Sequence, residues 1–184
     1  MKLHIRQAQP SELEAVRDFY WDLADEMREA DYGPAWTRGI YPSEADLCEH
    51  IEAGELYLAE AEIGPTPASN GATFAGAVVV NRHCNEEYTE VAWPSGATAD
   101  EAVVVHLLCI APEYQGQGLG RQLVAFAVDR ASVMGARAVR LDVLDGNLPA
   151  ARLYESCGFA PVTRIELFYE DTGRVMFILY ELAL

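Results

Sequence analysis

Basic side chains are scarce in this sequence. Its 184 residues include 13 lysine and arginine residues against 29 aspartate and glutamate residues, so the formal net charge is −16 at pH 7. An acidic surface repels the phosphate backbone of nucleic acids and the anionic head groups of membranes. The composition therefore argues against nucleic-acid binding and against attachment to a membrane, and it favours a cationic partner only weakly.

Closely spaced cysteine pairs are also missing. The four cysteines, which are far apart in the sequence and form no Cys-x-x-Cys pair, are Cys48, Cys84, Cys109 and Cys157. This usage is typical of reduced, packed thiols in a protein of the cytoplasm. Cys48 lies two residues before His50, and His83 adjoins Cys84, but neither pair has a second pair at zinc-finger spacing, so we expect no metal site.

A long hydrophobic run is the third missing feature. The longest apolar stretch covers residues 102–111 and is interrupted by His106, whereas a membrane-spanning helix needs about 20 apolar residues. With 51% hydrophobic and 23% charged residues, the composition is that of a globular protein long enough to bury a core without disulfides or metals. We expect a single domain over residues 1–184, located in the cytoplasm.

The spacing of apolar residues predicts an alternation of strands and helices. Helices are expected from Ser11 to before Gly33, over 43–53, from the glycine cluster to Met134 and over 148–156; strands are expected near 3–5 and over 55–63, 73–81, 103–110, 138–144, 159–169 and 174–182. A turn at 64–71 joins the second and third strands in a hairpin. This order predicts a mixed sheet covered by helices, in the α/β (α+β) class.

A glycine-rich turn follows the apolar strand at 103–110. Gly116, Gly118 and Gly120 alternate with other residues immediately before a helix. Because glycine has no side chain, a ligand can approach the backbone there, and the first amides of a helix have no partner within it. Together with the positive end of the helix dipole, these amides form a site suited to phosphate.

Two common nucleotide-binding motifs fit this turn poorly. The dinucleotide motif G-x-G-x-x-G would need a glycine where Arg121 stands, and Asp142, about 20 residues further on, lies in mid-strand rather than at a strand end. The Gly-Lys-Ser/Thr of a P-loop is missing. A third pattern, Gln/Arg-x-x-Gly-x-Gly/Ala, is met by Gln115, Gly118 and Gly120, although a tight turn that binds nothing could have the same sequence.

A second motif lies further along the chain. Asn147 is followed by two alanines, then by Leu153 and Tyr154, and finally by Gly158 and Phe159 before a strand. With the glycine turn and the order of elements over nearly the whole chain, it resembles the GCN5-related N-acetyltransferase (GNAT) family. The resemblance implies the GNAT fold, a central, mixed and mostly antiparallel β-sheet with a splayed strand pair, flanked by about four helices. The first hundred residues carry no comparably specific motif.

The resemblance also implies acetyl-CoA as co-substrate, with no metal. In the family, pantetheine lies between the splayed strands, the amides of the glycine turn hold the pyrophosphate, and the Asn and Tyr of the second motif lie beside the pantetheine and the sulfur. The cofactor-binding residues implied in this way are Leu108, Cys109, Ile110, Gln115, Gly116, Gln117, Gly118, Leu119, Gly120, Arg121, Asn147 and Tyr154.

The implied reaction is direct acetyl transfer to a primary amine. An alkylammonium with a pKa of about 10.4 must first lose its proton, at a cost of about 4.6 kcal/mol at pH 7. His106 is the candidate base, because strand alternation places it on one face with Leu108 and Ile110, although a hydrogen-bonded core histidine explains it equally. Tyr154 is the candidate acid for the leaving thiolate. An acyl intermediate on Cys109 is less favoured, because no base is paired with it.

Less specific candidates complete the site. Glu101, at the beginning of the same strand, is a weaker alternative for the base. Trp36, Tyr41, Tyr88 and Trp93 lie in loops that, by resemblance, roof the acceptor cleft. Aromatic walls suit an amine through cation–π contact, but such residues equally anchor loops by packing.

The sequence thus predicts an acetyl-CoA-dependent N-acetyltransferase acting on a small-molecule or peptide amine. The alternatives are an acyltransferase with another acyl donor or acceptor, and a catalytically silent acyl-CoA-binding or regulatory module. A homodimer is a further expectation, because dimers are frequent in the family. The identity of the acceptor is left open by the sequence.

Overall fold

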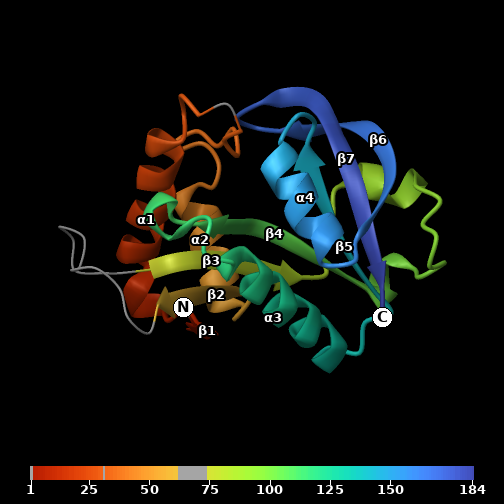
Figure 1. Cartoon of the computed structure of the whole chain (residues 1–184), viewed down its shortest axis with the longest axis horizontal. Helices are drawn as coiled ribbons and strands as arrows, with labels where there is room; N and C mark the ends of the chain where they lie inside the picture. Colours follow the sequence, from red (N-terminus) through yellow and green to blue (C-terminus); the bar gives the residue numbers. More distant parts are fainter. Residues whose placement is uncertain (1, 31, 62–73) are drawn as a thin grey trace.

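Seven strands form one mixed sheet in the computed structural model, which describes residues 2–30, 32–61 and 74–184 (Figure 1). The strands are β1 (Leu3–Gln7), β2 (Leu56–Ala61), β3 (Phe74–Asn81), β4 (Ala102–Ile110), β5 (Ala138–Leu144), β6 (Ala160–Tyr169) and β7 (Gly173–Ala183). Their spatial order is β1-β2-β3-β4-β5-β7-β6, and every neighbouring pair is antiparallel except β4 and β5. The α/β (α+β) class predicted from the sequence is confirmed.

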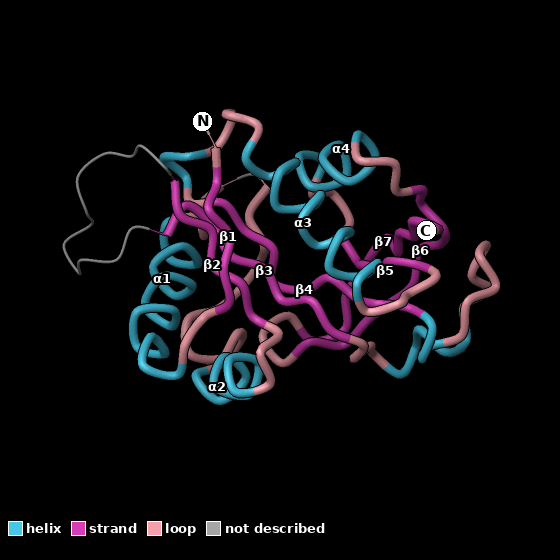
Figure 2. Tube along the Cα trace, turned by 90° about the horizontal axis from the view of Figure 1, so that it is seen from below, coloured by secondary structure: helices cyan, strands magenta, loops and turns pink. Residues whose placement is uncertain are grey.

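Four α-helices cover the two faces of the sheet. They are α1 (Leu13–Glu26), α2 (Glu44–Glu52), α3 (Leu119–Val133) and α4 (Leu148–Ser156). Figure 2 shows α1 and α2 on one face and α3 and α4 on the other. All eight residues of β3 are buried, because the strand is covered from both sides.

The element order matches the sequence prediction, but the first helix, expected to continue to just before Gly33, ends at Glu26. The α1 helix begins two residues after Ser11, because Pro10–Glu12 form a 3-10 turn. There the Glu12 carboxylate accepts the Gln9 N–H at 2.9 Å and is also held by the Arg6 guanidinium. The predicted hairpin turn at 64–71 lies outside the described residues.

The pair β4 and β5 separates along its length, as the GNAT resemblance implies. Ala102–Val104 pair in parallel with Ala138–Arg140, and beyond these residues the two fully described strands diverge. The backbone of Leu108–Ile110 therefore has no strand partner on the β5 side. This opening, at the carboxyl ends of both strands, positions the site described below.

A β-bulge interrupts β4 just before this opening. His106 is opposite Val79 and Cys109 is opposite Ala77, so two residues of β4 face the single residue Val78 of β3. Leu107, the first of the two, has a left-handed φ of 50°, and its carbonyl accepts the Tyr20 hydroxyl of α1 at 2.9 Å.

The bulge reverses the alternation of side chains along β4. Leu108 and Ile110 pack on the face covered by α3, together with Val103 and Val105. His106 is next to Val105 in regular strand, so its side chain is on the opposite face, which α1 and α2 cover. The prediction that His106 shares a face with Leu108 and Ile110 is therefore wrong, because it assumed an unbroken strand.

No helix in the described ranges of the chain is both long enough and apolar enough to cross a membrane.

Candidate active site

The glycine turn links β4 to the amino end of α3. A 3-10 turn at Pro112–Tyr114 follows β4, and α3 begins at Leu119. Gly116 and Gly118 have φ values of 73° and 76°, and the space beside each α-carbon is open. The left-handed backbone, and not crowding, is what requires glycine at both positions. The turn leaves the first amides of α3 without a partner inside the helix.

The third glycine of the turn has a packing role. A β-carbon on Gly120 would come within 3.1 Å of Leu153 Cδ2, so glycine lets α3 approach α4 closely. Next to it, an Nη of Arg121 donates to the Ser156 carbonyl at 2.7 Å, at the end of α4. Both contacts fix the position of α4 relative to the glycine turn.

A cavity of about 580 Å³ lies between these elements. Its wall consists of the last residues of β4, the glycine turn, α4, the end of α1 and the loop that follows α1. The lining residues are Leu23, Met27, Ala30, Tyr32, Pro34, Trp36, Leu108, Cys109, Ile110, Tyr114, Gln115, Gly116, Gly118, Leu119, Gly120, Arg121, Asn147, Pro149, Ala150, Leu153 and Tyr154. The volume is in the range of small-molecule and cofactor sites.

This cavity, the larger of the two described in this section, is lined by all the predicted cofactor-binding residues except Gln117. The Gln117 side-chain amide instead donates to the Glu113 carbonyl at 3.1 Å, one turn back along the chain. No local pattern predicts the wall formed by Leu23, Met27 and Tyr32, because only tertiary packing brings the end of α1 and the loop after it to this place.

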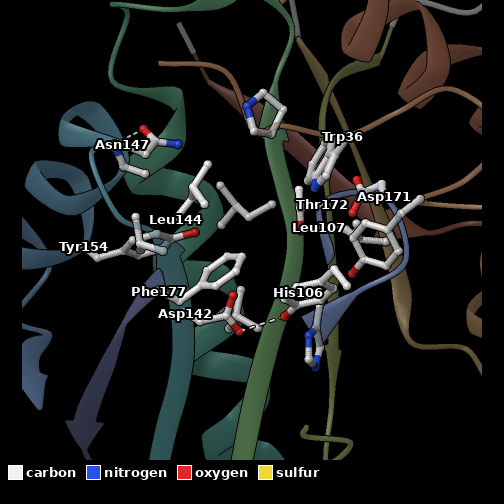
Figure 3. A pocket seen from close by; sticks show the side chains of 17 residues that line it. Trp36, His106, Leu107, Asp142, Leu144, Asn147, Tyr154, Asp171, Thr172 and Phe177 are labelled. Atoms are coloured by element: carbon white, nitrogen blue, oxygen red, sulfur yellow. Dashed lines mark hydrogen bonds between the residues drawn. The ribbon is translucent and has the colours of Figure 1, made fainter. Parts of the chain in front are cut away.

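A second, smaller cavity of about 120 Å³ adjoins the first between the diverging strands (Figure 3). Its lining residues are Pro34, Trp36, Tyr41, Val105, His106, Leu107, Leu108, Asp142, Val143, Leu144, Asn147, Ala150, Tyr154, Tyr169, Asp171, Thr172 and Phe177. Six residues line both cavities: Pro34, Trp36, Leu108, Asn147, Ala150 and Tyr154. The two cavities therefore meet beside Tyr154.

Tyr154 is a buried residue of α4 with an uncommitted hydroxyl. The oxygen makes no hydrogen bond to any residue that the structure describes, while the ring packs edge-to-face on Phe159. Burial raises the pKa of the phenol well above its usual value, and the charge of Asp142 adds to the rise. Tyr154 is therefore a protonated donor, located where the cavities join.

Asn147 caps the helix that carries Tyr154. Its side-chain oxygen accepts the Ala150 N–H at 3.2 Å at the start of α4. The cap leaves the side-chain NH₂ group available to the cavities that Asn147 lines.

His106 lines the smaller cavity as a neutral imidazole. Nε2 lies 2.9 Å from the His83 carbonyl oxygen. A carbonyl can only accept, so Nε2 carries the proton and Nδ1 has the free lone pair. Burial lowers the pKa of His106 to about 4, which leaves the ring uncharged at neutral pH.

Two carboxylates, neither singled out by the sequence analysis as part of this site, also line the smaller cavity. Asp142 on β5 accepts hydrogen bonds from the Tyr88 hydroxyl at 2.8 Å and from the Tyr169 hydroxyl at 3.1 Å. Asp171 belongs to the turn between β6 and β7. Burial raises the pKa of both carboxyl groups, and the hydrogen bonds from the phenols oppose the rise at Asp142.

The four predicted aromatic residues divide into two pairs. Trp36 and Tyr41 line the smaller cavity. Tyr88 and Trp93 do not belong to the wall of either cavity: Tyr88 is buried behind Asp142, and Trp93 packs on Tyr88 with the Arg140 guanidinium 4.1 Å from its ring centre. The prediction that these two roof the cleft is corrected, because they pack on Asp142 and Arg140 of β5 outside the walls of both cavities.

Two further candidates from the sequence are not placed for chemistry. Glu101 lies in a 3-10 turn before β4, pairs with Arg137 at 2.8 Å and lines neither cavity. Cys109 lines the larger cavity, but burial raises its thiol pKa to about 12, so the thiol stays protonated. In the described part of the chain, no three His, Cys, Asp or Glu side chains are grouped to hold a metal ion.

Comparison with known proteins identifies the class of this fold and site. The model of the acetyltransferase (GNAT) family matches residues 18–159. The fold is similar to that of a GNAT-family acetyltransferase from Listeria monocytogenes, with a TM-score of 0.71 and 23% identity over 99% of this chain and 95% of that one. It is also similar to yncA from Salmonella typhimurium, solved with its cofactor acetyl-CoA, with a TM-score of 0.67 and 18% identity over 100% and 95% of the two chains.

Curated relatives match over shorter stretches. The ribosomal protein bS18 alanine N-acetyltransferase of Escherichia coli (strain K12) is 37% identical over 73 residues, which are 40% of this chain and 49% of that protein. The mycothiol acetyltransferase of Geodermatophilus obscurus is 37% identical over 131 residues, 68% of this chain and 40% of that protein. The chain thus spans half the length or less of these relatives. On the family match, the chain belongs to the acetyltransferase (GNAT) family.

Proposed function

We propose that this chain is an acetyl-CoA-dependent N-acetyltransferase that transfers the acetyl group directly to a primary amine. The observation that carries the proposal is the meeting of two cavities at Tyr154, between strands that diverge. One cavity has the backbone donors that a diphosphate needs, and the other is a separate chamber for an acceptor. The acetyltransferase activities named for the relatives also support this proposed activity. So does the acetyl-CoA bound in the similar structure of yncA.

In this proposal the larger cavity takes the co-substrate. The unpaired amides at the start of α3 bind the diphosphate, where the helix dipole also favours negative charge. The backbone of Leu108–Ile110, which lacks a partner on the β5 side, hydrogen-bonds the pantetheine arm. Asn147 and Tyr154 then lie next to the thioester, and Arg121 supplies the positive charge near the phosphates.

Three groups of the chain carry the chemistry. A backbone amide at Cys109 or Ile110 polarises the thioester carbonyl. His106 accepts the proton of the amine through Nδ1, directly or through water, and Tyr154 donates a proton to the leaving thiolate. Transfer is direct, because the protonated Cys109 thiol is a poor nucleophile.

The test is acetyl-CoA turnover by the wild-type chain and by Tyr154→Phe. We expect wild type to release CoA with an amine acceptor, and the variant to lose about 10²- to 10⁴-fold in kcat, the usual contribution of a general acid. Calorimetry should show that both proteins still bind acetyl-CoA, so that the loss in the variant lies mainly in turnover. Tyr180→Phe is the matched control, since the Tyr180 hydroxyl faces Glu155 outside both cavities.

The outcomes separate the alternatives. Acetyl-CoA binding without turnover on any amine would leave a silent CoA-binding module, and preference for a longer acyl-CoA would change the donor. Absence of acetyl-CoA binding would reject the site itself.

Because His106 stays neutral above about pH 4, kcat/KM should rise with pH only as the amine loses its own proton. A separate inflection near pH 6.5, the ordinary pKa of histidine, would contradict the environment described for His106.

A further inference from the structure

The smaller cavity contains two carboxyl groups and no compensating positive charge. Asp142 and Asp171 line it, while none of its described lining residues is a lysine or arginine. His106 does not compensate them, because its ring is neutral. A buried carboxylate without a cationic partner is costly in free energy, and a cationic ligand removes that cost when it binds.

Asp142 is held firmly and keeps one oxygen available. Both phenol hydrogen bonds, from Tyr88 and Tyr169, reach Oδ2. Oδ1 accepts none from the residues that the structure describes. The two tyrosines come from different parts of the chain, so the carboxylate is fixed from two sides and faces the cavity (Figure 3). Asp142 and Tyr154 line the same cavity, and the charge of Asp142 adds to the rise in the pKa of Tyr154.

Asp171 faces the same cavity from another wall. Both of its carboxylate oxygens are shielded from solvent and make no regular hydrogen bond to the described residues, although backbone amides of Thr172 and Thr37 lie nearby. Figure 3 shows Asp171 and Trp36 on one side of the cavity and Tyr154 and Asn147 on the other. The two carboxyl groups therefore mark two positions, one near Tyr154 and one on the far wall.

Aromatic rings complete the wall between these positions. Trp36, Tyr41, Tyr169 and Phe177 line the cavity, and the rings of Tyr41 and Tyr169 pack 5.3 Å apart. Tyr41 is close enough to both carboxylates to feel the charge of each. Ring faces attract cations and also suit a short aliphatic chain.

We propose that the acceptor is a compact aliphatic diamine: one nitrogen lies at Asp142 and is acetylated, and the second binds as an ammonium at Asp171. The inference rests on the proposed function and specifies its substrate class. In the reaction an N–C bond forms and the thioester C–S bond breaks. His106 takes the proton of the reacting amine, and the thiolate receives one from Tyr154. The second nitrogen keeps its proton throughout.

The cavity disfavours other common acceptors. An amino acid would bring a third carboxylate among two that are already uncompensated. A volume of about 120 Å³ is small beside the cavities of about 300–1,000 Å³ that hold drug-sized ligands, and so favours a short acceptor. A monoamine would leave Asp171 without a partner.

The experiment compares three acceptors of one chain length: diaminobutane, butylamine and γ-aminobutyrate. We expect kcat/KM to be highest for diaminobutane, at least about tenfold lower for butylamine, as for loss of one charge-assisted contact, and lowest for γ-aminobutyrate. Asp171→Asn should raise KM for diaminobutane about tenfold, as for loss of one charge-assisted contact, and should remove most of the preference for diaminobutane over butylamine. Asp129→Asn, exposed on α3 away from both cavities, is the charge-matched control.

A binding measurement without acetyl-CoA completes the test. Calorimetry should detect diaminobutane binding to the wild-type chain and weaker binding to Asp171→Asn, with thermal melts confirming that the variant is folded. The diamine inference would be overturned if butylamine were turned over as fast as diaminobutane, or if diaminobutane did not bind. The proposed function would still hold in that case, provided that the chain binds acetyl-CoA and acetylates another amine. Failure to bind acetyl-CoA would reject the proposed function itself.

Discussion

At the scale of single residues, burial shifts His106, Asp142 and Asp171 of the smaller cavity toward their neutral forms. The pKa of His106 falls to about 4 and the pKa of Asp142 rises above its ordinary value of 3.8, in both cases mainly because the charged form loses solvation. His106 is uncharged at neutral pH as a result. Asp142, by contrast, is destabilised wherever it is ionised and no cation is bound.

This cost at Asp142 gives a stability prediction. A carboxyl whose pKa is higher in the folded than in the unfolded state binds more protons when folded, so the free energy of unfolding falls as pH rises between the two pKa values. Asp142→Asn removes the charge and keeps an acceptor for Tyr88 and Tyr169. The variant should therefore melt at a higher temperature than wild type at pH 8, with the difference shrinking toward pH 4.

Thermal melts across this pH range measure the difference, and Asp129→Asn on the surface of α3 is the control without burial. A difference in melting temperature that grew as the pH fell would contradict the raised pKa.

At the scale of elements, the amino end of α3 shows how much of the site is backbone. The first-turn amides of the helix are available because Gly116 and Gly118 adopt positive φ values of 73° and 76°. The sequence motif predicted this arrangement, because only glycine takes that conformation easily. The bulge in β4 had no such signal: Leu107 is not a residue that favours a φ of 50°, and the hydrogen bond from Tyr20 supports it from another element.

Alanine substitutions at the two ends of α3 separate strain from function. Gly118 and Gly135 have similar φ values of 76° and 71° and open space around them. Gly118→Ala and Gly135→Ala should each lower the free energy of unfolding by about 1–2 kcal/mol, the cost of a left-handed backbone for an L-residue. Gly118→Ala should in addition weaken acetyl-CoA binding about tenfold, as expected for disturbing a charge-assisted contact.

Urea unfolding and calorimetry measure these two effects. Equal acetyl-CoA affinities in the two variants would show that the glycine turn does not hold the diphosphate.

At the scale of the whole molecule, the proposed reaction requires this acidic protein to bind an anionic co-substrate, acetyl-CoA, and a cationic acceptor, the diamine. The net charge of −16 repels the polyanionic co-substrate during its approach and attracts a diamine. The local donors at α3 and the two carboxylates of the smaller cavity then select between them at short range. Added salt distinguishes these effects, because it screens the long-range attraction or repulsion due to the net charge more than it screens the contacts inside the cavities.

The association rate of acetyl-CoA should rise with salt, whereas kcat/KM for diaminobutane should fall. Between about 20 mM and about 300 mM salt the screening length shrinks from about 20 Å to about 6 Å, which removes most of the long-range term. Stopped-flow binding and steady-state kinetics measure the two trends, and repeating them with a second salt separates screening from specific ion effects. Two trends of the same sign would show that the overall charge has no such role.

The order of elements, the glycine turn and the second motif could all be predicted from the amino-acid sequence, because local periodicity and short motifs encode them. The range 148–156 predicted for a helix is that of α4, and the range 138–144 predicted for a strand is that of β5. These local signals sufficed for the family and for most of the larger cavity. The prediction failed for Tyr88, whose hydroxyl donates to Asp142 and which lines neither cavity.

The smaller cavity, by contrast, is formed by tertiary packing and could not be predicted from the sequence. Asp142 and Asp171 are 29 residues apart in the sequence and lie in no motif, yet the divergence of β4 and β5 and the turn between β6 and β7 bring both to one cavity. The bulge likewise decided which face His106 occupies. The pKa shifts and the grouping of these side chains depend on burial and on contacts between segments that are distant in the sequence. Local sequence patterns do not specify such contacts, so these features could not be predicted from them.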